Sequence, residues 1–127
     1  MGTRSLTFVY DGDVPVINIY RQYDGYPSGH GHELAQFLDS KTLVNGFGEQ
    51  NSFDANGMGC LAAQLIVQLK HGVGGIYIYP VSSTDCFQDY EYHVYEDRVV
   101  VKDPTAVIFE GTWKEFGQFC LDPISAE

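Results

Sequence analysis

Two arginines, and the glycine-rich turn that follows the second of them, are the residues near the start of the chain that could bind a small molecule. Arg4 and Arg21 lie on the first two predicted strands. Arginine holds a carboxylate or a phosphate through two parallel hydrogen bonds. Gly29 and Gly31 come directly before a predicted helix, whose first backbone N–H groups attract anions. Together these residues indicate a site for an anion.

The pairing of the first two strands would bring the two arginines together. Leu6 and Phe8 alternate with other residues in the first strand, and residues 16–23 form the second strand after the turn at 11–13. Directly opposed residues share a face, so apolar side chains must meet apolar side chains. A tighter turn makes the arginines diagonal neighbours on that same apolar face, where an unpaired charge is costly. With the longer turn, the expected pairs are Tyr10 with Pro15, Phe8 with Ile17, Leu6 with Ile19, and Arg4 with Arg21.

The anion expected beside the arginines has two alternative sources. Asp24 is close in sequence and would be an internal partner, and Glu33, in the first turn of the helix, would repel a bound anion. The other source is an external carboxylate or phosphate, with tyrosines stacking on a ring of a nucleotide-like ligand. In a further alternative both arginines fan out at the end of the sheet. The residues expected to form the ligand site are Arg4, Arg21, Tyr23, Asp24, Tyr26, Ser28, Gly29, His30, Gly31 and His32.

Catalysis is an alternative to simple binding. A hydrolase or transferase would use His30 or His32 as its base and Cys60, in the first turn of the second predicted helix, as its nucleophile. The glycines do not follow the phosphate-loop or dinucleotide patterns, and no Gly-x-Ser-x-Gly segment is present. The two histidines with Asp24 fix no third strong ligand, so we expect no metal and no cofactor. We favour a binding domain without enzymatic activity.

A third alternative is a structural protein, in which exposed aromatic residues of the last strands form a homo-oligomer interface. Composition limits the other partners. The 127 residues carry a net charge of −10, which is unsuited to general binding of nucleic acid or anionic membranes. No apolar run of about 18 residues is present. Three widely spaced cysteines and the lack of an apolar leader indicate reduced thiols and a cytoplasmic location.

The length predicts one domain over residues 1–127. The pattern predicts an α+β fold, with a mostly antiparallel sheet of about five to six strands, two main helices on one face and a short C-terminal helix. A turn at residues 96–97 places Glu91 opposite Lys102 on a solvated face that includes His93. Thr112 is the expected N-cap of the last helix, and residues 45–57 are expected to form a loop. The helices are expected at 32–40, 58–70 and 113–120, and the later strands at 76–79, 90–95, 98–102 and 106–110.

Two segments, Met1-Gly2-Thr3-Arg4 and the run Tyr-Arg-Gln-Tyr-Asp-Gly-Tyr-Pro-Ser-Gly-His-Gly over 20–31, resemble small hypothetical proteins of bacteria, phages and environmental sequence. The resemblance implies a setting in a bacterium or a phage-infected host cell. It implies no mechanism, because no activity is established for that group. It covers the same residues that the strand pairing brings together.

Overall fold

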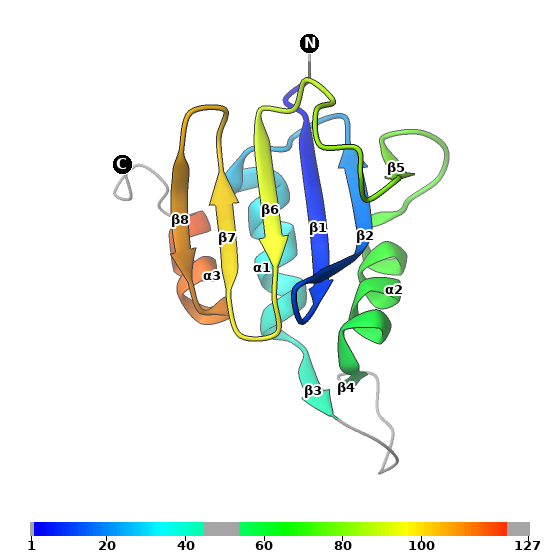
Figure 1. The fold of residues 1–127 in the computed structure, drawn as a ribbon, viewed down its shortest axis with the longest axis vertical. Helices are drawn as coiled ribbons and strands as arrows, with labels where there is room; N and C mark the ends of the chain where they lie inside the picture. Colours follow the sequence, from blue (N-terminus) through cyan, green and yellow to red (C-terminus); the bar gives the residue numbers. More distant parts are fainter. Residues whose placement is uncertain (1, 45–53, 122–127) are drawn as a thin grey trace.

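A computed structural model describes residues 2–44 and 54–121, and its main feature is a six-stranded sheet with helices on one face (Figure 1). The α+β class predicted from the sequence is confirmed. No helix among the described residues is both long and apolar enough to cross a membrane. The strands are β1 Ser5–Asp11, β2 Val14–Arg21, β3 Thr42–Val44, β4 Asp54–Asn56, β5 Ile76–Tyr79, β6 Tyr90–Val94, β7 Val99–Lys102 and β8 Val107–Gly111. The helices are α1 His32–Asp39, α2 Gly57–Leu69 and α3 Trp113–Leu121, and a π-helical turn, η1, spans Pro27–Gly31.

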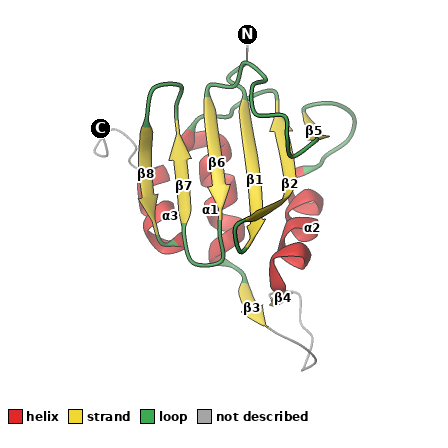
Figure 2. Cartoon of the chain, viewed as in Figure 1, coloured by secondary structure: helices red, strands yellow, loops and turns green. Residues whose placement is uncertain are grey.

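The strands of the large sheet follow the order β5-β2-β1-β6-β7-β8. The central pair, β1 and β6, is parallel, and the other neighbours are antiparallel. Figure 2 shows the three helices on the far side of this sheet. A separate parallel pair, β3 with β4, lies at the lower end of the domain. The predicted loop at 45–57 is therefore wrong for residues 54–57, and its residues 45–53 lie outside the described part of the chain.

The β1–β2 hairpin contains an irregularity that overturns the predicted strand register. Tyr10 pairs with Pro15 as expected, but Val9 pairs with Ile17, so Val16 is an extra residue. Such a bulge shifts all later pairs by one residue and moves their side chains to the other face. The observed pairs are Phe8 with Asn18, Leu6 with Tyr20, and Ser5 with Arg21. The predicted pairs Phe8–Ile17, Leu6–Ile19 and Arg4–Arg21 are wrong.

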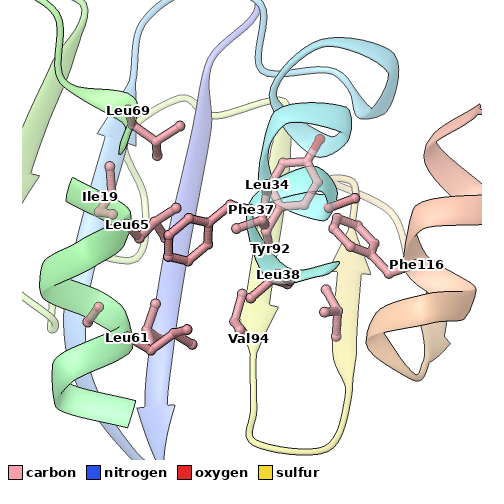
Figure 3. Close-up of a cluster of buried hydrophobic side chains, with 14 of the residues drawn as sticks. Ile19, Leu34, Phe37, Leu38, Leu61, Leu65, Leu69, Tyr92, Val94 and Phe116 are labelled. Atoms are coloured by element: carbon pink, nitrogen blue, oxygen red, sulfur yellow. The ribbon is translucent and has the colours of Figure 1, made fainter. Parts of the chain in front are cut away.

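Both faces of the sheet carry apolar residues because both are partly covered. On the outer face, which is the face away from the helices, Leu6, Phe8 and Tyr20 form a small cluster beneath the 80–89 loop. The Asn18 amide fastens this loop by donating hydrogen bonds to the carbonyls of Pro80 and Ser83. On the helix side lies the larger core (Figure 3), which includes Val9, Ile19, Leu34, Phe37, Leu38, Leu61, Leu65, Leu69, Tyr92, Val94 and Phe116.

The start of α3 is fixed by reciprocal hydrogen bonds. The Glu115 N–H donates to Thr112 Oγ1 over 3.1 Å, and the Thr112 N–H donates to Glu115 Oε1 over 2.8 Å. This is a capping box, in which each side chain satisfies a backbone group that has no partner within the helix. The predicted N-cap role of Thr112 is confirmed.

The segment between α2 and β5 turns at glycines and is held by a lysine. Gly74 and Gly75 have φ angles of 79° and 77°, values that glycine adopts without strain. The Lys70 ammonium donates hydrogen bonds to the carbonyls of Gly74 and Ile76, over 3.0 and 2.8 Å. These bonds fix the entry into β5, which is one edge of the sheet.

Candidate functional site

Arg21, at the end of β2, is the centre of a polar cluster on the helix side of the sheet. Its guanidinium makes two parallel hydrogen bonds to Glu33, with Nη1–Oε2 and Nη2–Oε1 distances of 3.1 Å each. Nε donates to the Tyr23 carbonyl over 2.8 Å, and Nη1 also donates to His30 Nδ1 over 3.2 Å. The internal partner of Arg21 is therefore Glu33. The expectation that Asp24 fills this role is wrong, because Asp24 accepts a hydrogen bond from the Tyr26 hydroxyl instead.

His30 is fully buried behind Arg21 and has a defined protonation state. Arg21 can only donate, so Nδ1 of His30 must accept, and the ring proton lies on Nε2. Nε2 then donates to Thr7 Oγ1 over 2.7 Å. Burial, and secondly the charge of Arg21, lowers the pKa of His30 from 6.5 to about 3. A neutral imidazole that is a fixed acceptor for Arg21 therefore holds the guanidinium in place throughout the neutral pH range.

The glycine-rich turn forms η1, and the backbone N–H groups from Gly29 to His32 are already hydrogen-bonded within it. The N–H groups of Gly29 and Gly31 donate to the Tyr26 carbonyl, that of His30 donates to Asp24, and that of His32 donates to Gly29. The prediction that this turn offers free donors to an anion is therefore wrong. π-Helical turns are rare and occur often at functional sites. Here the turn carries His30 beneath Arg21.

A cleft of about 550 Å³ opens beside the Arg21–Glu33 pair. It lies between α1, the C-terminal end of α2 and the turn that leads into β5, and we call it the Arg21–Glu33 cleft. Figure 3 shows Phe37 extending from α1 toward α2. Leu69, the last residue of α2, belongs to the same buried cluster as Phe37. The lining residues are Arg21, Tyr23, Glu33, Gln36, Phe37, Ser40, Gln68, Leu69, His71, Gly74, Gly75 and Ile76.

Two of the ten predicted site residues, Arg21 and Tyr23, line this cleft. The Tyr23 side chain is exposed at its rim. His30 supports Arg21 from within, as described above. Gly29 has a steric role, because a Cβ there would lie 2.6 Å from the Asp24 carbonyl oxygen. Gly31 is also confined, although less tightly, since its Cβ would lie 2.9 Å from the Sγ atom of the Cys120 side chain.

The remaining predicted residues lie elsewhere. Arg4 comes directly before Ser5, which pairs with Arg21, so the alternation of side chains puts Arg4 on the opposite, outer face of the sheet and apart from Arg21. The Arg4 backbone N–H donates to the Asp89 carboxylate over 3.0 Å. Ser28 is exposed on η1, and Tyr26 is exposed directly before it. His32 is half-buried at the start of α1 and lines a smaller cavity of about 240 Å³ beside α3.

The catalytic alternative with Cys60 is not assembled in the structure. Cys60 lies in the first turn of α2, which follows β4 directly. Both ring nitrogens of His30 are bonded to other residues, Thr7 and Arg21, and His32 lines a cavity beside α3 that does not include Cys60. A base must reach its nucleophile within hydrogen-bond distance. The prediction of a Cys60–histidine pair is therefore wrong for this conformation.

The aromatic residues of the last strands do not form the exposed surface that the structural alternative requires. Tyr92 is buried, and Tyr90, Tyr95 and Phe109 are half-buried. Tyr92 points into the helix-side core, where its hydroxyl donates to the Gly25 carbonyl over 2.6 Å and fastens the turn before η1. The interface predicted from these aromatic residues is therefore not supported by their exposure.

A chain of hydrogen bonds on the outer face joins Tyr10, His93 and Glu91 and was not predicted from the sequence. Glu91 pairs with Lys102 as predicted, but His93 is buried and stacks on Phe8 with 5.0 Å between ring centroids. Nε2 of His93 donates to Glu91 Oε1 over 2.9 Å, and the Tyr10 hydroxyl donates to Nδ1 over 2.6 Å. The hydrogen bond from His93 is the main factor that lowers the pKa of Glu91. The prediction of a solvated face is wrong at His93.

The order tyrosine–histidine–carboxylate is one in which a histidine can accept a proton from a nucleophile. Burial and the neighbouring Tyr95 raise the pKa of Tyr10, which keeps its hydroxyl protonated. The cavity of about 260 Å³ next to Glu91 is lined by Gln88 and Lys102 but not by Tyr10. We therefore assign this chain of hydrogen bonds to the stability of the outer face.

Besides Glu33, four polar residues of the cleft were not among the predicted site residues, namely Gln36, Ser40, Gln68 and His71. Gln36 follows Glu33 by three positions and Ser40 follows Gln36 by four, so the helical repeat places them on one face. That spacing was a signal in the sequence. Gln68 has no comparable signal, because only the packing of α2 beside α1 brings it to the cleft.

Among the described residues, no three or more His, Cys, Asp or Glu side chains are grouped so that they could hold a metal ion. Compared with protein-family models, with curated proteins and with solved structures, the chain shows no match.

Proposed function

We propose that the domain binds a small molecule carrying a carboxylate or a phosphate in the Arg21–Glu33 cleft, without catalysing a reaction on it. The observation that supports this proposal is the arrangement of hydrogen-bond partners around the Arg21 guanidinium. Two partners within the protein hold the guanidinium in place: the Tyr23 carbonyl accepts from Nε, and the buried His30 accepts from Nη1. The outer side of the guanidinium carries a flat, two-pronged acceptor, the Glu33 carboxylate. A ligand carboxylate has the same shape and charge as that acceptor.

Exchange of Glu33 for a ligand is supported by the difference in exposure within the pair. The Glu33 side chain is 50% exposed, whereas that of Arg21 is 15% exposed. Glu33 can therefore rotate into water and regain its hydration, while Arg21 stays in the wall of the cleft. An ion pair with one well-exposed partner contributes about 1 kcal/mol or less, so its opening is a small cost for a bound anion.

Binding can be tested by thermal shift and calorimetry with succinate, citrate, adenosine monophosphate and inorganic phosphate as probes. At a concentration 100 times Kd, a ligand specific for the folded state stabilises it by about 2.7 kcal/mol. We expect at least one probe to raise the Tm of the wild type and to have no effect on Arg21→Ala. Arg98→Ala is the matched control, because it removes the same charge from an exposed pair with Asp97.

The Glu33→Gln variant gives a second test of the proposal. It removes the competing carboxylate and keeps the shape of the side chain, so it should bind the active probe more tightly than the wild type does. The proposal is wrong if no probe shifts the wild type, or if Arg98→Ala and Arg21→Ala weaken binding equally.

A further inference from the structure

The Arg21–Glu33 cleft contains charges of both signs in direct contact, and this limits the class of ligand. A simple anion would bind Arg21 and displace the Glu33 carboxylate into water, so that Glu33 loses its ionic partner and gains none. We propose that the ligand is a zwitterionic α-amino acid with an apolar side chain, and this inference rests on the function proposed above. The amino acid would separate the pair, with its carboxylate on Arg21 and its ammonium group on Glu33. One ion pair is then replaced by two.

The charge of the whole protein favours a zwitterion over a strong anion. The chain carries a net charge of −10, so a phosphate or a tricarboxylate approaches it against a repulsive field. A zwitterion has no net charge and meets no such barrier. Its two ends also match the polarity of the pair, because the cation and the anion of the wall are adjacent.

The other lining residues suit the rest of an amino acid. The Gln36 and Gln68 amides supply both donors and acceptors in the cleft, and the Ser40 hydroxyl, which donates to the Phe37 carbonyl over 2.7 Å, supplies an acceptor. These groups suit the remaining hydrogen-bonding positions of a carboxylate and an ammonium group. Phe37 and Leu69 are almost completely buried, with 6% and 4% exposure, and still border the cleft. They form an apolar wall for a side chain of the leucine or phenylalanine type. Sites for small molecules commonly combine an apolar lining with a few polar groups of this kind.

The inference can be tested with matched probes by calorimetry at neutral pH. L-Leucine carries both charged groups, 4-methylpentanoate lacks the ammonium group, and 3-methylbutylamine lacks the carboxylate. L-Phenylalanine and 3-phenylpropanoate form a second matched pair. We expect each amino acid to bind the wild type at least tenfold more tightly than its analogues. Arg21→Ala should abolish binding of the amino acids and of the carboxylates alike.

Glu33→Gln separates this inference from the function on which it rests. The variant should bind 4-methylpentanoate more tightly than the wild type does, because the competing carboxylate is gone. It should bind L-leucine at least tenfold more weakly, because the ammonium group loses its partner. If the carboxylates bind as tightly as the amino acids, the amino-acid inference fails and the anion site stands. If neither the amino acids nor any anionic probe binds the wild type, both fail.

Discussion

Arg21 and Glu33 form a two-pronged ion pair whose members differ in their surroundings. The Glu33 side chain has water on one side, whereas the Arg21 guanidinium is also bonded to the Tyr23 carbonyl and to His30. Removal of one residue of the pair should therefore cost more stability than removal of the other. Loss of the carboxylate leaves a cation that still has partners, while loss of the cation leaves several groups without them.

This asymmetry predicts unequal effects on stability. Glu33→Gln should lower the free energy of unfolding by about 1 kcal/mol or less, as is typical of exposed ion pairs. Arg21→Ala should lower it by about 2 kcal/mol or more, because a buried acceptor on His30 loses its donor. Urea unfolding at neutral pH measures both values. Equal losses in the two variants would contradict this account.

His30 predicts a dependence of stability on pH. Its pKa is lowered from 6.5 to about 3 in the folded protein. Between these two pH values His30 is protonated in the unfolded chain and neutral in the folded protein, so protonation favours unfolding. The contribution of the neutral His30 to the free energy of unfolding is therefore complete above pH 6.5 and is lost as the pH falls toward 3. The full shift corresponds to on the order of 5 kcal/mol.

Urea unfolding between pH 7.5 and pH 4 checks this prediction. His30→Gln should be less stable than the wild type at pH 7.5, and the difference between the two proteins should shrink as the pH falls. A difference that stays constant over this range would show that His30 titrates alike in the folded and unfolded chains.

Gly29 is predicted to resist substitution because of its close approach to the backbone. In Gly29→Ala the new Cβ would lie 2.6 Å from the Asp24 carbonyl oxygen, so the turn must shift. We expect a loss of stability of about 1 to 3 kcal/mol and altered chemical shifts at His30. Gly59→Ala is the control, because its new Cβ would meet nothing within 4 Å outside its chain neighbours and the nearby backbone of α2. Alanine at this helical position should raise stability by up to about 1 kcal/mol. Equal losses in both variants would argue against the steric explanation.

Tyr10 and His93 are predicted to be energetically coupled. Tyr10→Phe removes the donor to Nδ1 of His93, and His93→Gln removes the acceptor and the stack on Phe8. A double-mutant cycle should give a coupling energy of about 0.5 kcal/mol or more, as is usual for residues of one hydrogen-bond network. Additive losses would mean that the short Tyr10–His93 contact contributes nothing of its own.

The local elements of the fold were predictable because local signals specify them. Strand β5 was predicted with its observed bounds, Ile76–Tyr79, from the glycines before it and Pro80 after it. The cap of α3 followed from Thr112, and the pairing of Glu91 with Lys102 followed from a short turn. Each of these features depends on residues that are close in sequence.

The position of Arg4 was not predictable in the same way. The hairpin register was right at Tyr10 and Pro15, and the single extra residue Val16 changed it for the rest of the strand. The predicted register assumed one apolar face, whereas the 80–89 loop covers a second one over Leu6 and Phe8. With apolar residues on both faces, alternation no longer identifies the face that meets the helices.

The candidate site was predicted only at its centre. Arg21 was singled out correctly as a cation that needs an anion, and the structure supplies Glu33. The opposite wall of the cleft comes from α2 and the turn after it, some 35 residues or more along the chain from Glu33. No short-range pattern relates Gln68 to α1, because their proximity is a product of helix packing on the sheet.

Lys70 affects whether the open edge of the sheet at β5 can pair with a strand from another copy of the protein. The bond from the Gln22 N–H to the Gly75 carbonyl directs the carbonyl of the next residue, Ile76, away from β2 and toward the open edge of the sheet. The Lys70 ammonium occupies that carbonyl, and the Ile76 N–H is turned back onto Gly74. A strand from another molecule would have to displace a charged group to extend the sheet. The uncharged Ile-Tyr-Ile-Tyr edge is thereby protected against the edge-to-edge growth that leads to fibres.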